Sequence, residues 1–163
     1  MTEAIYSKTK LEHLTDYIVN HLNTDVLNNK IDAWQENAQL ILNGEDRGNG
    51  GYVICHWRYR VVLHIEEFPH QILDPRYLLA LIACWLGDFD TERDEYDMGD
   101  PEIAVDVISH EAADVSVELE LMEPVEMIPD PMGMISWKGQ TYRVQAVQID
   151  TAEEAELINE AAD

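Results

Sequence analysis

VICHWRYRVVLHIE, residues 53–66, decides the fold because apolar and polar side chains alternate along it. One face carries an unbroken apolar set: Cys55, Trp57, Tyr59, Val61, Leu63 and Ile65. The other face is mostly polar or charged: His56, Arg58, Arg60, His64 and Glu66. A period of two is typical of a strand with one buried face. The stretch therefore predicts a long strand with one side against the core.

Two helices flank this strand in the sequence. Leu11, Leu14, Ile18 and Leu22 recur at helical spacing, and Thr9 with Glu12 forms a capping box, so a helix is predicted up to Leu22. A second helix is predicted over residues 76–86, where Asp74 and Pro75 supply its cap and first turn and Gly87 its end. Because YLLALIACWL is apolar on nearly all sides, we expect the sheet and a neighbouring subunit to cover it.

The remaining chain reads as strands and connections. Strands are predicted over 38–43, 103–107 and 114–123, with turns at 44–51 and 110–114, an irregular connection over 123–133, and a final hairpin over 134–147 that turns at Lys138–Gly139. This order predicts an α+β domain, a mainly antiparallel sheet with two principal helices packed on it. We place one domain in residues 1–148 and an acidic helix or tail, capped by Thr151 and Glu154, in 149–163.

Charge dominates the composition. The 163 residues include 33 acids and 10 bases, a formal net charge of −23, with 46% hydrophobic residues. The hydrophobic content is that of a globular domain. The negative charge argues against nucleic acid and anionic membranes as partners, since both are held by clustered Lys and Arg. The longest apolar run, residues 77–86, is too short for a membrane span. Cys55 and Cys84 both lie in apolar patterns and are predicted to be buried free thiols.

LGDFDTERDEYDMGD, residues 86–100, raises the question of a calcium loop. Counting from Asp88 gives carboxylates at positions 1, 3 and 5 of an EF-hand, but Arg93 at position 6 and Gly99 at position 12. Counting from Asp90 puts Glu95 and Pro101 at those positions. The turn glycine and the closing glutamate are missing in both registers. The segment is therefore interpreted as a solvated connector or a partner-contact loop.

No pattern for catalysis or cofactor binding stands out. The Gly-rich loop GEDRGNGG, residues 44–51, lacks the phosphate-binding spacing and its lysine. The histidines form no HExxH or HxH motif, and His13 and His21 are predicted to face solvent. Cys55 and His56 point to opposite faces of a strand, so they cannot form a thiolate pair. We expect no enzyme activity, no cofactor and no metal.

Several residues are candidates for contacts with partners. Arg58 and Arg60 share a strand face, and so do Glu118 and Glu120, which permits either a charge ladder within one sheet or a stripe that docks a neighbouring subunit. The second group comprises Leu79 and Trp85 on the apolar helix, expected at a subunit seam. The third comprises Asp88, Asp90, Glu92 and Asp94 in the acidic connector.

The order of these pieces resembles the tail completion protein R family of contractile-tailed temperate phages, which is related to lambda-type tail terminators. The resemblance rests on HWRYRVVLHIEEFP (56–69), LLALIACWL (78–86) and DVSVELELMEPVEM (114–127), and covers about residues 31–135. The glycine-rich loop and everything after about Met134 depart from the family pattern.

The resemblance implies a structural subunit with a tail-terminator-like fold. Such a subunit would form a homo-hexameric ring on the last ring of the tail tube, stop its growth and meet the head–neck connector. The implied partners are further copies of the chain, a tail tube or sheath protein and the connector, in the host cytoplasm during assembly and then in the virion tail. The alternative is an acidic binding module, such as a DNA mimic that occupies a host DNA-binding protein.

Overall fold

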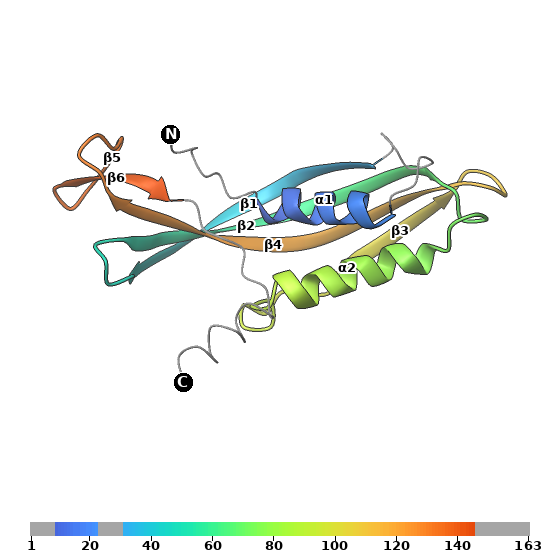
Figure 1. Cartoon of the computed structure of the whole chain (residues 1–163), viewed down its shortest axis with the longest axis horizontal. Helices are drawn as coiled ribbons and strands as arrows, with labels where there is room; N and C mark the ends of the chain where they lie inside the picture. The colour runs from blue at the N-terminus through green and yellow to red at the C-terminus, as the bar shows by residue number, and fades with distance from the viewer. Residues whose placement is uncertain (1–8, 23–30, 146–163) are drawn as a thin grey trace.

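A computed structural model describes residues 9–22 and 31–145. It contains α1 (Lys10–Leu22), β1 (Ile31–Asp46), β2 (Tyr52–Phe68), α2 (Pro75–Phe89), β3 (Glu102–Val107), β4 (Ala113–Pro129), β5 (Ile135–Trp137) and β6 (Gln140–Gln145). All strand pairs are antiparallel, in the order β1-β2-β4-β6-β5, with β3 also beside β4 (Figure 1). The predicted α+β class is confirmed.

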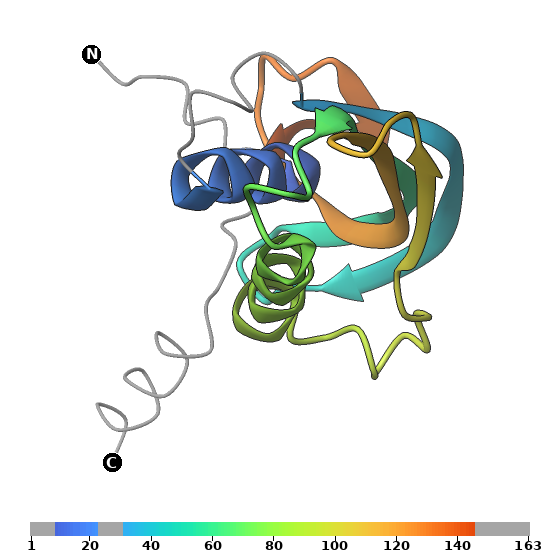
Figure 2. The same ribbon diagram turned by 90° about the vertical axis from the view of Figure 1, so that its right-hand side faces the viewer.

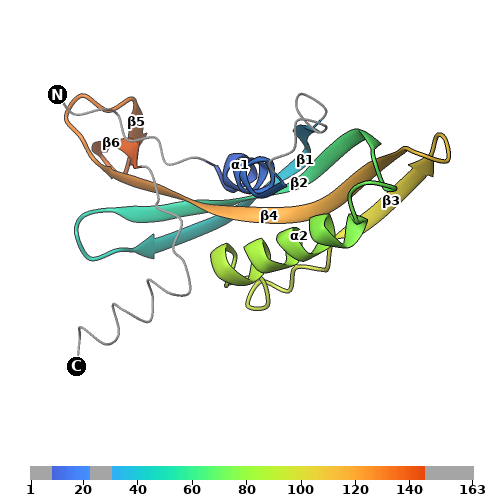
Figure 3. The ribbon, with the colours of Figure 1, turned by 45° about the vertical axis from the view of Figure 1, so that its right-hand side comes forward.

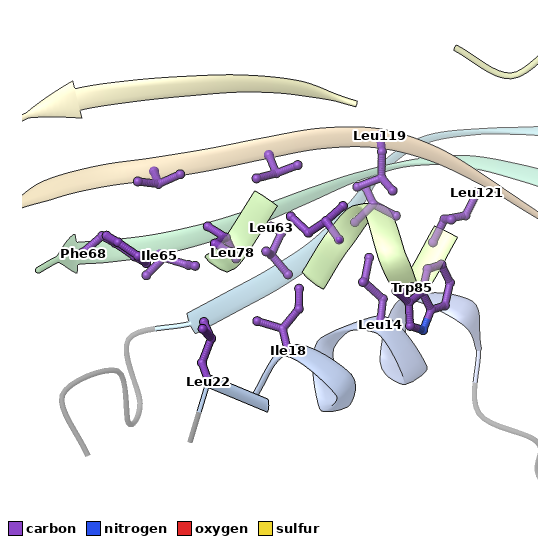
Figure 4. Close-up of a cluster of buried hydrophobic side chains, with 14 of the residues drawn as sticks. Leu14, Ile18, Leu22, Leu63, Ile65, Phe68, Leu78, Trp85, Leu119 and Leu121 are labelled. Carbon is purple, nitrogen blue, oxygen red and sulfur yellow. The ribbon is translucent and has the colours of Figure 1, made fainter. Parts of the chain in front are cut away.

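The sheet curls, and both helices pack on the same face of it (Figure 2). The apolar face of β2 meets α1 through Leu14 and Ile18 and α2 through Ile82 and Trp85. Figure 4 shows Leu14, Ile18 and Trp85 meeting between the elements. Leu119 and Leu121 of β4 complete the layer. The face of residues 53–66 that was predicted to be apolar therefore forms the floor of the core.

The local signals for helix and turn formation are confirmed. Thr9 Oγ1 accepts a hydrogen bond from the Glu12 backbone N–H at 3.2 Å, and Asp74 Oδ1 accepts one from the Arg76 N–H at 2.9 Å. The final hairpin turns at Lys138 and Gly139, with φ angles of 49° and 78°. Two positive φ angles are typical of the type I′ turn, whose twist matches that of the strands it joins.

Several predicted boundaries were wrong, including the end of β1, which lies at Asp46 rather than at residue 43. Strand β1 begins at Ile31 rather than at residue 38, because pairing with β2, from Ile31 opposite Ile65, outweighs a sequence without clear alternation. Strand β4 continues to Pro129. It accommodates Pro124 because residues 119–125, between the segments paired with β3 and β6, have β2 as their only strand neighbour among the described residues.

Helix α2 also runs past its predicted end. It continues through Gly87 to Phe89, and the Asp90 N–H closes its last turn on the Leu86 carbonyl at 3.1 Å. The extra turn brings the Phe89 ring against His13, with ring centroids 4.6 Å apart. This packing offsets the cost of a helical glycine, about 1 kcal/mol relative to alanine.

One cysteine is not where the sequence pattern placed it. Cys55 is buried in β2, whereas Cys84 is exposed on α2. The apolar residues of α2 surround the helix, but only one side meets the sheet and α1, so Cys84 falls on the uncovered side. The acidic helix predicted for 149–163 lies outside the described residues, and the division into 1–148 and 149–163 stays a prediction.

Gly133 gives a prediction about the β5–β6 hairpin. A Cβ atom at Gly133 would lie 2.1 Å from the Tyr142 carbonyl oxygen, a backbone atom of β6 that cannot simply rotate away. We expect Gly133→Ala to cost about 1–3 kcal/mol of overpacking and to speed amide hydrogen exchange across β5 and β6. Gly99→Ala is the control, because its added Cβ would meet no atom within 4 Å. Equal exchange rates in the two variants would contradict the prediction.

Candidate functional site

An apolar groove runs between α2 and β3. Ile103, Val105 and Val107 of β3 lie opposite Val117, Val115 and Ala113 of β4, so they continue the core face of the sheet. Neither α1 nor α2 covers them, and 60% of the Val105 side chain remains exposed. Figure 3 shows β3 as the outer strand beside α2. The hydrophobic core is therefore open along this edge.

Two adjoining cavities make up the groove. One, of about 260 Å³, lies between β3 and the start of α2, and the other, of about 590 Å³, lies between the end of α2 and the acidic connector. Leu79 and Ile103 line both cavities and join them. At the apolar end, the buried Nε2 atom of His70 has no hydrogen-bond partner among the described residues. An uncovered apolar surface of this kind is suited to a partner that brings apolar side chains.

A buried charge cluster holds the acidic connector in place beside the groove. The Asp90 carboxylate is 2.7 Å from Lys10 Nζ and 2.9 Å from Arg93 Nη1. Arg93 also donates to the carbonyl oxygens of Glu120 and Gly99, both at 2.6 Å. Asp90 is only 4% exposed, so the interpretation of residues 88–100 as a solvated connector is wrong for this residue. The cluster ties α1, β4 and the connector together.

A second polar contact supports the start of α1. Tyr59 Oη donates a hydrogen bond to Glu123 Oε2, and the Leu11 backbone N–H donates to Tyr59 Oη at 3.3 Å. Burial raises the pKa of the Glu123 carboxyl, and the hydrogen bonds from Tyr59 and from the Lys10 backbone oppose that rise. Burial and the nearby Glu123 raise the pKa of the Tyr59 phenol, which keeps it a proton donor. This contact orients α1 over the sheet.

Because the pKa of Glu123 is raised, we expect the free energy of unfolding to depend on pH. The folded state binds this proton more tightly than the unfolded chain, so the contribution of Glu123 is fullest below its ordinary pKa of 4.5 and is lost as pH rises through the folded value. Between pH 5 and pH 8, we expect the wild-type free energy of unfolding to fall relative to that of Glu123→Gln. Urea titrations at each pH measure this difference. Glu102→Gln, at an exposed side chain, is the control, and parallel curves for Glu123→Gln and wild type would contradict the prediction.

The structure pairs the charged strand residues within one chain. Arg58 Nη2 lies 2.5 Å from Glu120 Oε2, and Arg60 donates to Glu118. The interpretation as a charge ladder between two strands is thus confirmed. Docking of the same stripe against a neighbouring subunit stays a prediction.

The other residues predicted to contact partners differ in how far they are exposed. Trp85 is fully buried and Asp90 nearly so, so in the folded chain neither side chain offers surface to a partner. Leu79 is 38% exposed and lies at the junction of the groove. Asp88, Glu92 and Asp94 are exposed. Their role in contacts stays a prediction, and the geometry favours Leu79 and Asp94, which line the groove.

Sequence reasoning missed two features of this region. His13 was predicted to face solvent, but its Nδ1 atom accepts a hydrogen bond from the Trp85 indole N–H at 2.8 Å. Its position one turn before the apolar Tyr17 was a signal for partial burial. The groove was also missed, because a strand pattern does not show how far a helix will cover it. The described residues contain no group of three His, Cys, Asp or Glu side chains placed to hold a metal ion. No helix in the same ranges is long and apolar enough to cross a membrane.

These features define a small acidic α+β protein with a surface suited to protein–protein contact. Residues 8–146 match the model of the family described as P2 phage tail completion protein R (GpR). The chain belongs to this family and is a structural protein of phage tails. The resemblance noted from the sequence is confirmed. Its expected extent was too small, because the match spans the loop 44–51 and continues past Met134 to residue 146, through the hairpin that was expected to depart from the family.

A relative in Haemophilus phage HP1 (strain HP1c1) is similar over much of its length. It is described as an uncharacterized 19.2 kDa protein in the rep-hol intergenic region, and it is 29% identical over 126 residues. The match covers 77% of this chain and 76% of the relative. No solved structure matches the chain.

Proposed function

We propose that this protein completes the phage tail as a homo-oligomeric ring, a hexamer, that caps the tail tube and joins it to the head–neck connector. The family match over residues 8–146 carries the proposal, because the family is described by tail completion. The open groove between α2 and β3 supports action through protein contacts, since burying exposed apolar residues such as Val105 against a partner is favourable.

The negative charge of the chain would help DNA to pass through such a ring. Each chain carries a net charge of −23. Acidic walls repel the phosphate backbone, so DNA would pass through the opening without being held. We propose that the exposed acids of residues 88–100 that lie outside the groove, such as Asp88 and Glu92, contribute to this lining. An assembled ring with a neutral or basic opening would contradict that part of the proposal.

Tail assembly in a phage that carries this gene tests the function. Without the protein, we expect tubes of uncontrolled length and heads without tails in electron micrographs of the lysate. Supplying the wild-type protein should restore joined particles of normal length. Leu79→Asp, which places a charge at the groove junction, should restore few or none. Normal joined particles in the absence of the protein would overturn the proposal.

A further inference from the structure

The β5–β6 hairpin differs in charge from the rest of this acidic protein. Residues 131–145 contain no Asp or Glu and two bases, Lys138 and Arg143. Large apolar side chains stand out from the same end, with Met134 97% exposed and Met132 90% exposed. Methionine adapts its shape to a partner surface more readily than branched residues do. The segment 131–145 is therefore apolar and carries a net positive charge of its own, next to Glu126 of β4 and Asp130.

The cations at this end are also the ones least engaged within the chain. Five other described bases have a carboxylate oxygen within 2.9 Å: Lys10, Arg58, Arg60, Arg76 and Arg93. By contrast, Arg143 is 3.6 Å from Asp130, and Arg47 is 3.8 Å from its nearest carboxylates. Lys138 Nζ lies over the Trp137 ring, 4.6 Å from its centroid. Among the described residues, Lys138 forms no ion pair with a carboxylate, and Arg143 and Arg47 form only long ones.

The groove between α2 and β3 is also apolar, but the charge around it has the opposite sign. Residues 88–102 hold eight acids and a single base, Arg93, whose guanidinium is occupied by Asp90 and two carbonyl oxygens. Asp94 and Asp100 line the larger cavity, next to the apolar strip of β3. The groove is thus apolar with a negative rim, and it complements the hairpin in both respects.

We infer that the β5–β6 hairpin of one copy seats in the α2–β3 groove of the next. The hairpin lies at one end of the long axis and the start of α2 with the end of β3 toward the other, in both Figure 1 and Figure 3. The contact therefore joins different surfaces of two copies. A heterologous contact of this kind closes into a ring when its rotation permits. The inference rests on the proposed ring and names its interface.

The C-terminal segment of the chain fits the groove less well. Residues 146–163 contain six acids and no base, so they would bring like charge to the negative rim. The hairpin brings positive charge through Lys138 and Arg143. The second copy is thus the occupant favoured by charge.

Light scattering behind gel filtration tests the contact with one variant on each surface. Met134→Asp alters the hairpin and Val105→Asp the groove, and both positions are exposed enough for the chain to remain folded. We expect wild type to run as a multi-subunit species and each variant to run as a single chain, with at least a tenfold weaker association. Val19→Asp, at an exposed apolar residue of α1, should keep the wild-type mass. Circular dichroism confirms that all variants are folded.

Mixing the two variants is the decisive measurement. Each still has one intact surface, so a 1:1 mixture should give a complex of two chains and no larger species. A charge reversal adds a second reading: Lys138→Glu with Arg143→Glu should dissociate the ring, and adding Asp94→Lys with Asp100→Lys to the same chain should restore it.

Three results would overturn the inference: a wild-type chain that stays monomeric at the highest concentration, variants that keep the wild-type mass, or a mixture that stays monomeric. None of these decides the tail function, which the assembly test addresses separately. If variants of both surfaces keep the wild-type mass and still complete tails, then another interface builds the ring.

Discussion

Trp85→Ala is expected to lower the free energy of unfolding by about 3–5 kcal/mol, a large part of the stability of a typical domain. The Trp85 side chain is fully buried between α1, α2 and the sheet (Figure 4). Its removal leaves a large cavity and also removes the indole N–H that donates to His13 Nδ1 at 2.8 Å. Urea unfolding followed by far-UV circular dichroism measures the loss.

Two controls separate packing from other effects of the substitution. Trp85→Phe keeps an aromatic ring and removes the N–H. Its free energy of unfolding should therefore lie between those of wild type and Trp85→Ala. Tyr77→Ala, on the exposed side of the same helix, should change little. An unfolding midpoint for Trp85→Ala close to that of Tyr77→Ala would contradict the packing argument. Because Trp85 lies in the core, Leu79 is the better position for probing subunit contacts.

Asp90→Ala is also expected to lower the free energy of unfolding by about 3–5 kcal/mol, because it removes one member of a buried ionic cluster. Lys10 and Arg93 both face the Asp90 carboxylate, and their side chains are only 15% and 11% exposed. Without Asp90, both cations stay partly buried without their counter-ion. Arg93 also loses the partner that directs it toward Glu120 and Gly99, so the connector should loosen.

The measurement combines urea unfolding with amide hydrogen exchange over residues 88–100. Asp88→Ala is the matched control, an exposed carboxylate two positions earlier in the same acidic run. Asp90→Asn keeps the shape and one acceptor while removing the charge, so a loss similar to that of alanine would assign the effect to charge. If Asp90→Ala and Asp88→Ala unfolded alike, the cluster would not hold the connector.

Three sequence segments were enough to predict the family, and the family match supports a role in the phage tail. The groove itself could not be predicted. Alternation at Ile103, Val105 and Val107 predicts a strand with one apolar face, and that strand is present. Whether a helix covers the face depends on the path of α2 across the sheet, which no local pattern encodes.

What the sequence determined by itself was local. Alternation over residues 53–66, the caps at Thr9 and Asp74, and the turn at Lys138–Gly139 each depend on neighbours within a few positions, and each is present in the structure. Only the tertiary structure decided the rest. Asp90 is buried because it forms an ion pair with Lys10, 80 positions earlier in the chain. Helix α2 continues beyond Gly87 because the Phe89 ring packs against His13. The reason is physical: hydrogen-bond geometry in caps and turns acts within a few residues, whereas burial and ion pairing depend on which distant segments the chain brings together.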